Sequence, residues 1–185
     1  MRVVAGKHRS RPLISPKNRD VRPTTDMVKE SIFNIIQNDV VGSKFLDLFA
    51  GSGAIGIEAI SRGAEKVVFV DSSKESIGIV KQNLQMLNED AQVIFGDYQY
   101  ALSRLKNAQF DIIFLDPPYD FKEFEKLMAL IAENNVLADC GIVVYESLFN
   151  KNDNKCTSGY NIVKSKKYGI TAINIYEAEW WKNVW

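Results

Sequence analysis

The feature that most constrains the fold is the regular order of short apolar strands and amphipathic helices after residue 44. Apolar runs such as FLDLFA (45–50) and KVVFVD (66–71) are each followed by a segment with hydrophobic residues at helical spacing. Such alternation predicts a mostly parallel sheet with helices on both faces. Ligands of these sheets bind beyond the carboxyl ends of the strands, where this chain carries aspartates and glycines.

The length of 185 residues predicts one domain over 1–185. We expect a basic, extended arm over 1–23, a helix over 24–38 and a Rossmann-like core over 44–178. Strands are predicted at 45–50, 66–71, 92–95, 110–116 and 141–146, with helices at 54–62, 98–105 and 121–134. Ser72 and Glu75 form a capping-box pattern for a further helix that reaches Leu87. The C-terminal segments 161–168 and 171–176 predict an antiparallel strand pair around Gly169.

Several classes of protein are excluded by composition. No apolar run approaches the roughly 20 residues of a membrane span, and the first residues lack the apolar segment of a secretory signal. Two cysteines and one histidine, without a CxxC motif, are too few for a structural zinc site and favour a reducing, cytoplasmic location. We therefore expect a cytoplasmic protein that uses no metal and no membrane.

Charge is unevenly distributed along the chain. Residues 1–30 carry eight basic and three acidic groups, a net charge of +5, which leaves the remaining 155 residues at −5. A basic arm on an acidic body indicates a polyanionic partner. Charge alone slightly favours the alternative, a solvated and poorly ordered N-terminus.

A glycine-rich loop joins the first predicted strand to its helix. Gly51, Gly53 and Gly56 form GxGxxG, and Asp71 follows twenty residues after Gly51, at the end of the next strand. This context predicts a nucleoside cofactor whose ribose hydroxyls donate to Asp71. Asp47, at the end of the first strand, suits the ammonium of a methionine moiety, so S-adenosylmethionine is favoured over NAD. The alternative for the glycine pattern is a turn that binds no ligand. The alternative for Asp47 is a local cap or loop hydrogen bond.

The third predicted strand also ends beside an acidic residue. Asp97 and Tyr98 follow Phe95, and Asp97 suits either the adenine amino group or a cap for the next helix. Both roles can hold at once.

The sequence DPPY (116–119) follows the fourth predicted strand. Pro117 and Pro118 end the strand and stiffen the backbone. The Asp116 carboxylate and the Pro117 carbonyl can accept hydrogen bonds from the two N–H groups of an exocyclic amino group, while Tyr119 stacks on the base. The pattern predicts methyl transfer to a base amino group; the alternative is a strand end followed by a proline turn.

Four segments resemble one family closely: MRVVAGKHRSRPL (1–13), VRPTTDMVKE (21–30), the segment with the glycine loop (45–64) and the segment with DPPY (111–119). Together they resemble the bacterial 16S rRNA guanine-N2 methyltransferases, over residues 1 to about 178. The resemblance implies the class I S-adenosylmethionine-dependent fold with a seven-stranded sheet and an RNA-facing arm. It implies a cofactor pocket at Asp47, Phe49, Gly51, Gly53, Asp71, Ser72, Asp97 and Tyr98. It implies a base pocket at Asp116, Pro117, Pro118 and Tyr119, and phosphate contacts at Arg9, Arg11, Arg19 and Arg22.

The resulting prediction is methylation of a guanine N2 in 16S rRNA of the small subunit or its assembly intermediate, by a monomer. The alternatives are a DNA adenine-N6 or cytosine-N4 methyltransferase, an NAD-dependent oxidoreductase and a non-catalytic RNA-binding assembly factor. The sequence leaves open which guanine is modified. It also leaves open the roles of Arg22, Thr25 and the C-terminal tryptophans.

Overall fold

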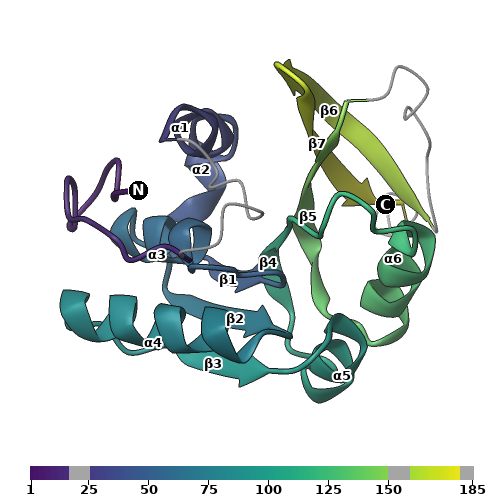
Figure 1. Ribbon diagram of the computed structural model, residues 1–185. Coiled ribbons are helices and arrows are strands. Elements are labelled where there is room, and N and C mark those ends of the chain that lie inside the picture. The colour runs from purple at the N-terminus through teal and green to yellow at the C-terminus, as the bar shows by residue number, and fades with distance from the viewer. Residues whose placement is uncertain (17–25, 150–158, 180–185) are drawn as a thin grey trace.

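A computed structural model describes residues 1–16, 26–149 and 159–179. Its centre is a seven-stranded sheet with the order β3-β2-β1-β4-β5-β7-β6 (Figure 1). The strands are β1 Lys44–Asp47, β2 Lys66–Asp71, β3 Gln92–Phe95, β4 Phe110–Leu115, β5 Leu137–Leu148, β6 Tyr160–Tyr168 and β7 Thr171–Ala178. The helices are α1 Asp26–Ile35, α2 Gln37–Val40, α3 Ala54–Ser61, α4 Lys74–Leu87, α5 Tyr98–Arg104 and α6 Phe124–Glu133.

The topology confirms the predicted Rossmann-like fold. Strands β1 to β5 pair in parallel, and β7 lies antiparallel between β5 and β6. The order runs from β1 through β2 to β3 in one direction and from β4 to β5 in the other. The switch point between β1 and β4 is where such sheets bind ligands.

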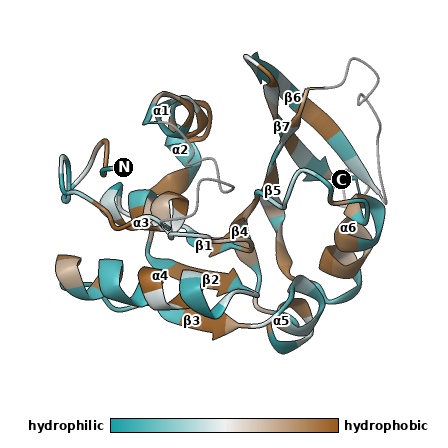
Figure 2. Ribbon diagram, in the orientation of Figure 1, coloured by the Kyte–Doolittle hydropathy of each residue, from teal (hydrophilic) through white to brown (hydrophobic). Residues whose placement is uncertain are grey.

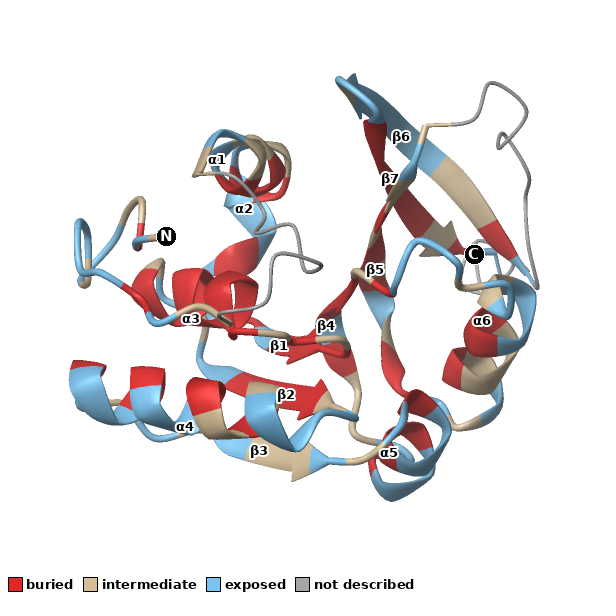
Figure 3. Ribbon diagram, viewed as in Figure 1, coloured by how far each residue is buried: buried red, intermediate tan, exposed pale blue. Residues whose placement is uncertain are grey.

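Side chains alternate across the strands and build two cores. Phe45 and Phe114 belong to a core beneath α1–α4, whereas Leu46 and Leu115 belong to a core beneath α5 and α6. This alternation follows from the two-residue period of a strand. Figure 2 shows the hydrophobic central strands, and Figure 3 shows that their residues are buried.

Some predicted boundaries were wrong. The helix expected at 24–38 is divided: α1 ends at Ile35, and the four-residue α2 follows it. The N-cap of α4 is Ser73, whose Oγ accepts from the Ser76 N–H at 3.3 Å, and not Ser72. Strand β5 extends well beyond the predicted 141–146 at both ends.

For residues 1–16, both the predicted extended arm and the alternative of a poorly ordered N-terminus are wrong. This segment folds back on itself through a bridge between Arg2 and Pro12, and it lies beside α3 (Figure 1). Val3 and Leu13 are buried in the core. The chain therefore gains apolar burial and backbone hydrogen bonds that its basic composition does not reveal.

A buried ion pair joins this segment to the body. Lys29 of α1 and Glu58 of α3 are fully buried, with Nζ and Oε2 3.2 Å apart. Glu58 also accepts from the backbone N–H groups of Val4 and Ala5 and from Arg62 Nε, at 2.8, 2.9 and 2.8 Å. One carboxylate therefore connects the first residues to two helices.

In the part of the chain that the structure describes, no helix is long and apolar enough to cross a membrane. The same residues contain no group of three or more histidine, cysteine or acidic side chains arranged to hold a metal ion.

Candidate active site

A cavity of about 510 Å³ opens at the carboxyl ends of β1 and β4. Its size falls within the range of roughly 300–1,000 Å³ that is usual for small-molecule sites. The glycine loop and the DPPY segment both contribute to its wall, together with residues from the N-terminal segment, α1, β5 and the β6–β7 turn. Among the predicted site residues, the lining contains Asp47, Phe49, Gly51, Asp116, Pro117, Pro118 and Tyr119.

The glycine loop places a buried carboxyl group at one side of the cavity. Asp47 is 1 % exposed and accepts from the Gly56 N–H at 2.9 Å. Gly56 lies so close to β2 that a Cβ atom there would stand 2.3 Å from the Phe69 ring. Only glycine allows α3 to approach the sheet this closely, and that approach brings its N–H to Asp47. Gly53, the N-cap residue of α3, lies outside the cavity lining.

Asp71 and Ser72 follow β2 and also lie outside this lining. The Asp71 carboxylate accepts from the Gly51 N–H and from the Ser73 N–H, each at 2.8 Å. These bonds hold the glycine loop against the end of β2. A ribose hydroxyl at Asp71 has to share acceptor atoms that the backbone already uses.

Asp97 and Tyr98 stand at the end of β3, beyond the lining of the cavity. Asp97 caps α5 by accepting from the Tyr100 N–H at 2.8 Å. The Tyr98 hydroxyl donates to Glu123 Oε2 at 2.9 Å, and its ring contacts Phe49. Burial and the Glu123 carboxylate raise the pKa of Tyr98. The cap expected for Asp97 is confirmed, and its contact with adenine stays a prediction.

The DPPY segment forms the opposite wall of the cavity. Asp116 follows the last residue of β4, Pro117 is buried, and Pro118 is exposed. The Tyr119 side chain is 53 % exposed at the rim of the cavity, where its ring is accessible to a planar base. A carboxyl group, a proline-fixed backbone and an aromatic ring thus share one wall.

Burial and neighbouring acids raise the pKa values of two carboxyl groups in this cavity, Asp47 and Asp116. Burial raises the pKa of Asp47 to about 7, with a further contribution from Asp71. Burial, then Glu146 and Asp47, raises the pKa of Asp116 well above its usual range. Such shifts, caused by desolvation and like charge, are typical of functional sites.

The sequence reasoning missed part of this wall. Glu146 of β5 is 8 % exposed and lines the cavity, as do Val28 of α1 and Tyr168 and Thr171 at the β6–β7 turn. A signal for Glu146 existed, because an acidic residue ends the apolar run GIVVYE at the carboxyl end of a predicted strand. The other contributions depend on tertiary packing and leave no local pattern.

The predicted RNA-contacting arginines are only partly described. Arg9 and Arg11 are exposed, and Arg11 Nη2 donates to the Met86 carbonyl at 3.0 Å. Arg19 and Arg22 lie outside the described residues, as do Thr25 and the C-terminal tryptophans. The proposed phosphate contacts stay predictions.

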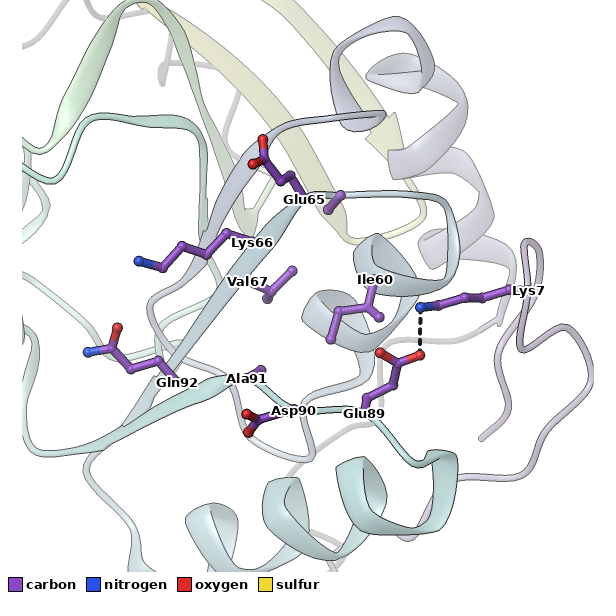
Figure 4. Close-up of a pocket in the computed structure, with 10 residues that line it drawn as sticks. Lys7, Ile60, Glu65, Lys66, Val67, Glu89, Asp90, Ala91 and Gln92 are labelled. Carbon is purple, nitrogen blue, oxygen red and sulfur yellow. Dashed lines mark ion pairs between the residues drawn. The ribbon is translucent and has the colours of Figure 1, made fainter.

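A second cavity, of about 480 Å³, lies at the amino ends of β2 and β3 (Figure 4). Lys7 Nζ and Glu89 Oε1 form an ion pair of 2.6 Å beside it. It lies at the opposite edge of the sheet from the strand ends where ligands of this fold bind, so we assign no function to it.

Comparisons with known proteins identify the family of this chain. Residues 1–177 match the family described as Conserved hypothetical protein 95. The Haemophilus influenzae protein named ribosomal RNA small subunit methyltransferase D is 37 % identical over 185 residues, covering 96 % of this chain and 93 % of that protein. Its Escherichia coli namesake is 31 % identical over 180 residues, covering 97 % and 90 %.

Solved structures share the fold. The Escherichia coli protein yhhF has a TM-score of 0.87 and 30 % identity, covering 97 % of this chain and 98 % of that chain. SMU.776, solved in complex with SAH, has a TM-score of 0.67 and 15 % identity over 86 % of this chain and 50 % of that one. The chain therefore belongs to the Conserved hypothetical protein 95 family, together with the small-subunit ribosomal RNA methyltransferases D.

Proposed function

We propose that this protein transfers a methyl group from S-adenosylmethionine to the exocyclic N2 of a guanine in 16S rRNA. Methylation of ribosomal RNA follows from the family, and the guanine N2 target is the finer step proposed here. The observation that carries the proposal is one cavity that holds Asp47 of the glycine loop and the DPPY segment together. A cofactor and a target base can therefore meet in the same space.

The residues present fit the cofactor, S-adenosylmethionine. Asp47 is a buried carboxyl whose ionisation a bound ammonium group would favour, and the Gly51 backbone is open to the same cavity. Asp47, Phe49 and Gly51 would hold the methionine side, whereas Gly53 supports the loop. Asp71, Ser72, Asp97 and Tyr98, at the ends of β2 and β3, would hold the ribose and adenine. Bound there, the cofactor supplies an electrophilic methyl group.

The DPPY residues prepare the base. An aryl amine is a weak nucleophile because its lone pair is delocalised into the ring. The Asp116 side chain and the Pro117 carbonyl accept hydrogen bonds from its two N–H groups out of the ring plane, which directs the lone pair away from the ring. When N2 bonds to the methyl carbon and the methyl–sulfur bond breaks, N2 loses one proton to Asp116 or to water. Tyr119 stacks on the base and contributes roughly 1–3 kcal/mol, while Pro118 keeps the backbone rigid.

The N-terminal segment provides the charge for RNA. Arg9 and Arg11 are exposed in the N-terminal segment 1–16, which folds back on itself as a hairpin. The two ends of this segment, Met1 and Pro16, line the cavity. Arg19 and Arg22 follow in the same basic stretch. Contacts of these arginines with phosphates would give an affinity that falls with salt.

The experiment is transfer of labelled methyl to unmodified small subunits, naked 16S rRNA and duplex DNA, with identification of the labelled nucleoside. We expect label in N2-methylguanosine from rRNA, and the comparison of particle with naked RNA tells whether ribosomal proteins belong to the substrate. Label in N6-methyladenine or N4-methylcytosine would overturn the guanine target. Cofactor binding without label on any acceptor would favour a non-catalytic assembly factor.

A further inference from the structure

A second buried carboxyl group stands beside Asp116 on the neighbouring strand. Leu115 of β4 pairs with Tyr145 of β5, so Asp116 and Glu146 occupy the next position of the same parallel register. Residues two apart on a strand share a face. Asp116 and Glu146 therefore continue the face that carries Phe114 and Val144 and that packs beneath α1 and α3.

Strand pairing on both sides of β5 fixes the backbone at Glu146. Its side chain is 8 % exposed and lines the cavity that contains DPPY. On the other side of β5, Glu146 pairs with Ile173 of β7, in a ladder of seven residue pairs. Neighbouring strands lie about 4.8 Å apart, so one base edge can reach the carboxyl groups of Asp116 and Glu146 together.

The chemistry of the base edge separates guanine from the other amino bases. Next to its exocyclic amino group, guanine carries a ring N1–H, which is a donor. In adenine and in cytosine, the ring nitrogen on the Watson–Crick side of the amino group is an acceptor. A carboxylate accepts hydrogen bonds and repels acceptors, so a second carboxylate beside the amino-binding site selects guanine.

We propose that Glu146 is a specificity-determining residue. Its carboxylate accepts a hydrogen bond from the N1–H of the target guanine, while Asp116 and Pro117 hold the N2 amino group of the same base. This inference rests on the proposed guanine N2 activity and names the group that reads the base. The base pocket then includes the carboxyl end of β5, which carries Glu146, as well as the carboxyl end of β4, which Asp116 follows.

The test replaces the target guanine with 2-aminopurine, which keeps the N2 amino group but has no hydrogen on N1. The substituted rRNA is assembled into small subunits by ligation at the position mapped with labelled methyl. Guanine donates a hydrogen bond from N1–H to the charged Glu146 carboxylate, and 2-aminopurine does not. We therefore expect the kcat/KM of the wild-type protein to be about 10- to 150-fold higher for guanine than for 2-aminopurine. Because 2-aminopurine also lacks the guanine O6, a variant is needed to isolate the N1 contribution.

Glu146→Gln keeps the size of the side chain, and its amide can accept from N1–H or donate to an unprotonated N1. We expect its preference for guanine to shrink by about tenfold or more, with unchanged affinity for S-adenosylmethionine. Asp139→Asn, an exposed acid at the other end of β5, should retain the wild-type preference. A Glu146→Gln protein with the wild-type preference would overturn the inference.

Two further outcomes keep the two proposals apart. A wild-type protein that forms N2-methylguanosine but uses 2-aminopurine equally well would exclude N1–H recognition, whether or not Glu146→Gln folds. A wild-type protein that forms no N2-methylguanosine would overturn the proposed function, and the Glu146 inference with it.

Discussion

Two buried groups of charges lie on the same face of the sheet and differ in kind. At the first, Glu58 meets Lys29, Arg62 and two backbone N–H groups. At the second, the acidic groups Asp47, Asp116 and Glu146 line one cavity, and burial together with Glu146 and Asp47 raises the pKa of Asp116. The first cluster therefore balances its carboxylate with cations, whereas the described lining of the second contains no lysine or arginine, so a bound cation would favour ionisation of its acids.

Lys29→Met is expected to have the largest effect on stability. It removes one of the two cations that pair with buried Glu58, which keeps Arg62, so we expect a loss of about 1–3 kcal/mol in the free energy of unfolding. Chemical denaturation measures the loss. Lys126→Met is the matched control, because Lys126 pairs with Glu123 at 3.1 Å on the exposed face of α6, where such a pair contributes roughly 0–1 kcal/mol. Equal losses in both variants would remove the distinction between the clusters.

Asp116→Ala is expected to lower the rate of methyl transfer by about 10²–10³-fold, because the reacting amino group loses one positioned polar contact. Single-turnover kinetics measure the transfer, and calorimetry measures affinity for S-adenosylmethionine. The affinity should stay close to that of the wild type. A fall in affinity as large as the fall in rate would move Asp116 into the cofactor site.

Asp47→Asn is expected to stabilise the cofactor-free protein at high pH. Burial raises the pKa of Asp47 to about 7, whereas an unfolded aspartate titrates near 3.9. The folded state therefore holds its proton longer, and the wild type loses stability as pH rises from about 4 to above 7. Asparagine carries no such penalty, so we expect the Tm of the variant to exceed that of the wild type at pH ~8 and to be close to it at pH ~4.

The same variant tests the cofactor. If the Asp47 carboxylate holds the methionine ammonium, wild-type affinity for S-adenosylmethionine rises between about pH 6 and pH 8 as Asp47 ionises. In Asp47→Asn the affinity is lower, and this part of its pH dependence is lost. Asp90→Asn, an exposed acid outside the cavity, should follow the wild type. An unaltered pH profile in Asp47→Asn would contradict the ammonium contact.

Arg9→Ala has the smallest expected effect. One lost phosphate contact should weaken RNA binding a few-fold at low salt and reduce the slope of log affinity against log salt by about one. Filter binding at several salt concentrations measures the slope. A slope equal to that of the wild type would remove Arg9 from the RNA contacts.

The strands could be predicted because each is a local apolar run, whereas their order within the sheet depends on tertiary pairing and was not predicted. Asp47, Asp71 and Asp116 could be picked out for a related reason: the carboxyl ends of parallel strands meet at one edge. The sequence did not reveal the buried Lys29–Glu58 pair, since its partners are 29 residues apart and each looks like a solvated helix residue. Glu146 joins the cavity through the pairing of β4 with β5, which no local pattern encodes.

The hairpin of residues 1–14 has a consequence for the order of events during synthesis. Its anchors include His8 Nε2 against Glu89 Oε1 at 2.5 Å and the Ile14 N–H to Asn83 Oδ1 at 2.8 Å, across 81 and 69 residues of sequence. At roughly 5–20 residues per second, a ribosome needs about 3–16 s to make the intervening chain. Throughout that time the hairpin lacks these two anchors and can use only contacts with elements made earlier, such as those of Val4 and Ala5 with Glu58 of α3, so the segment made first completes its packing late.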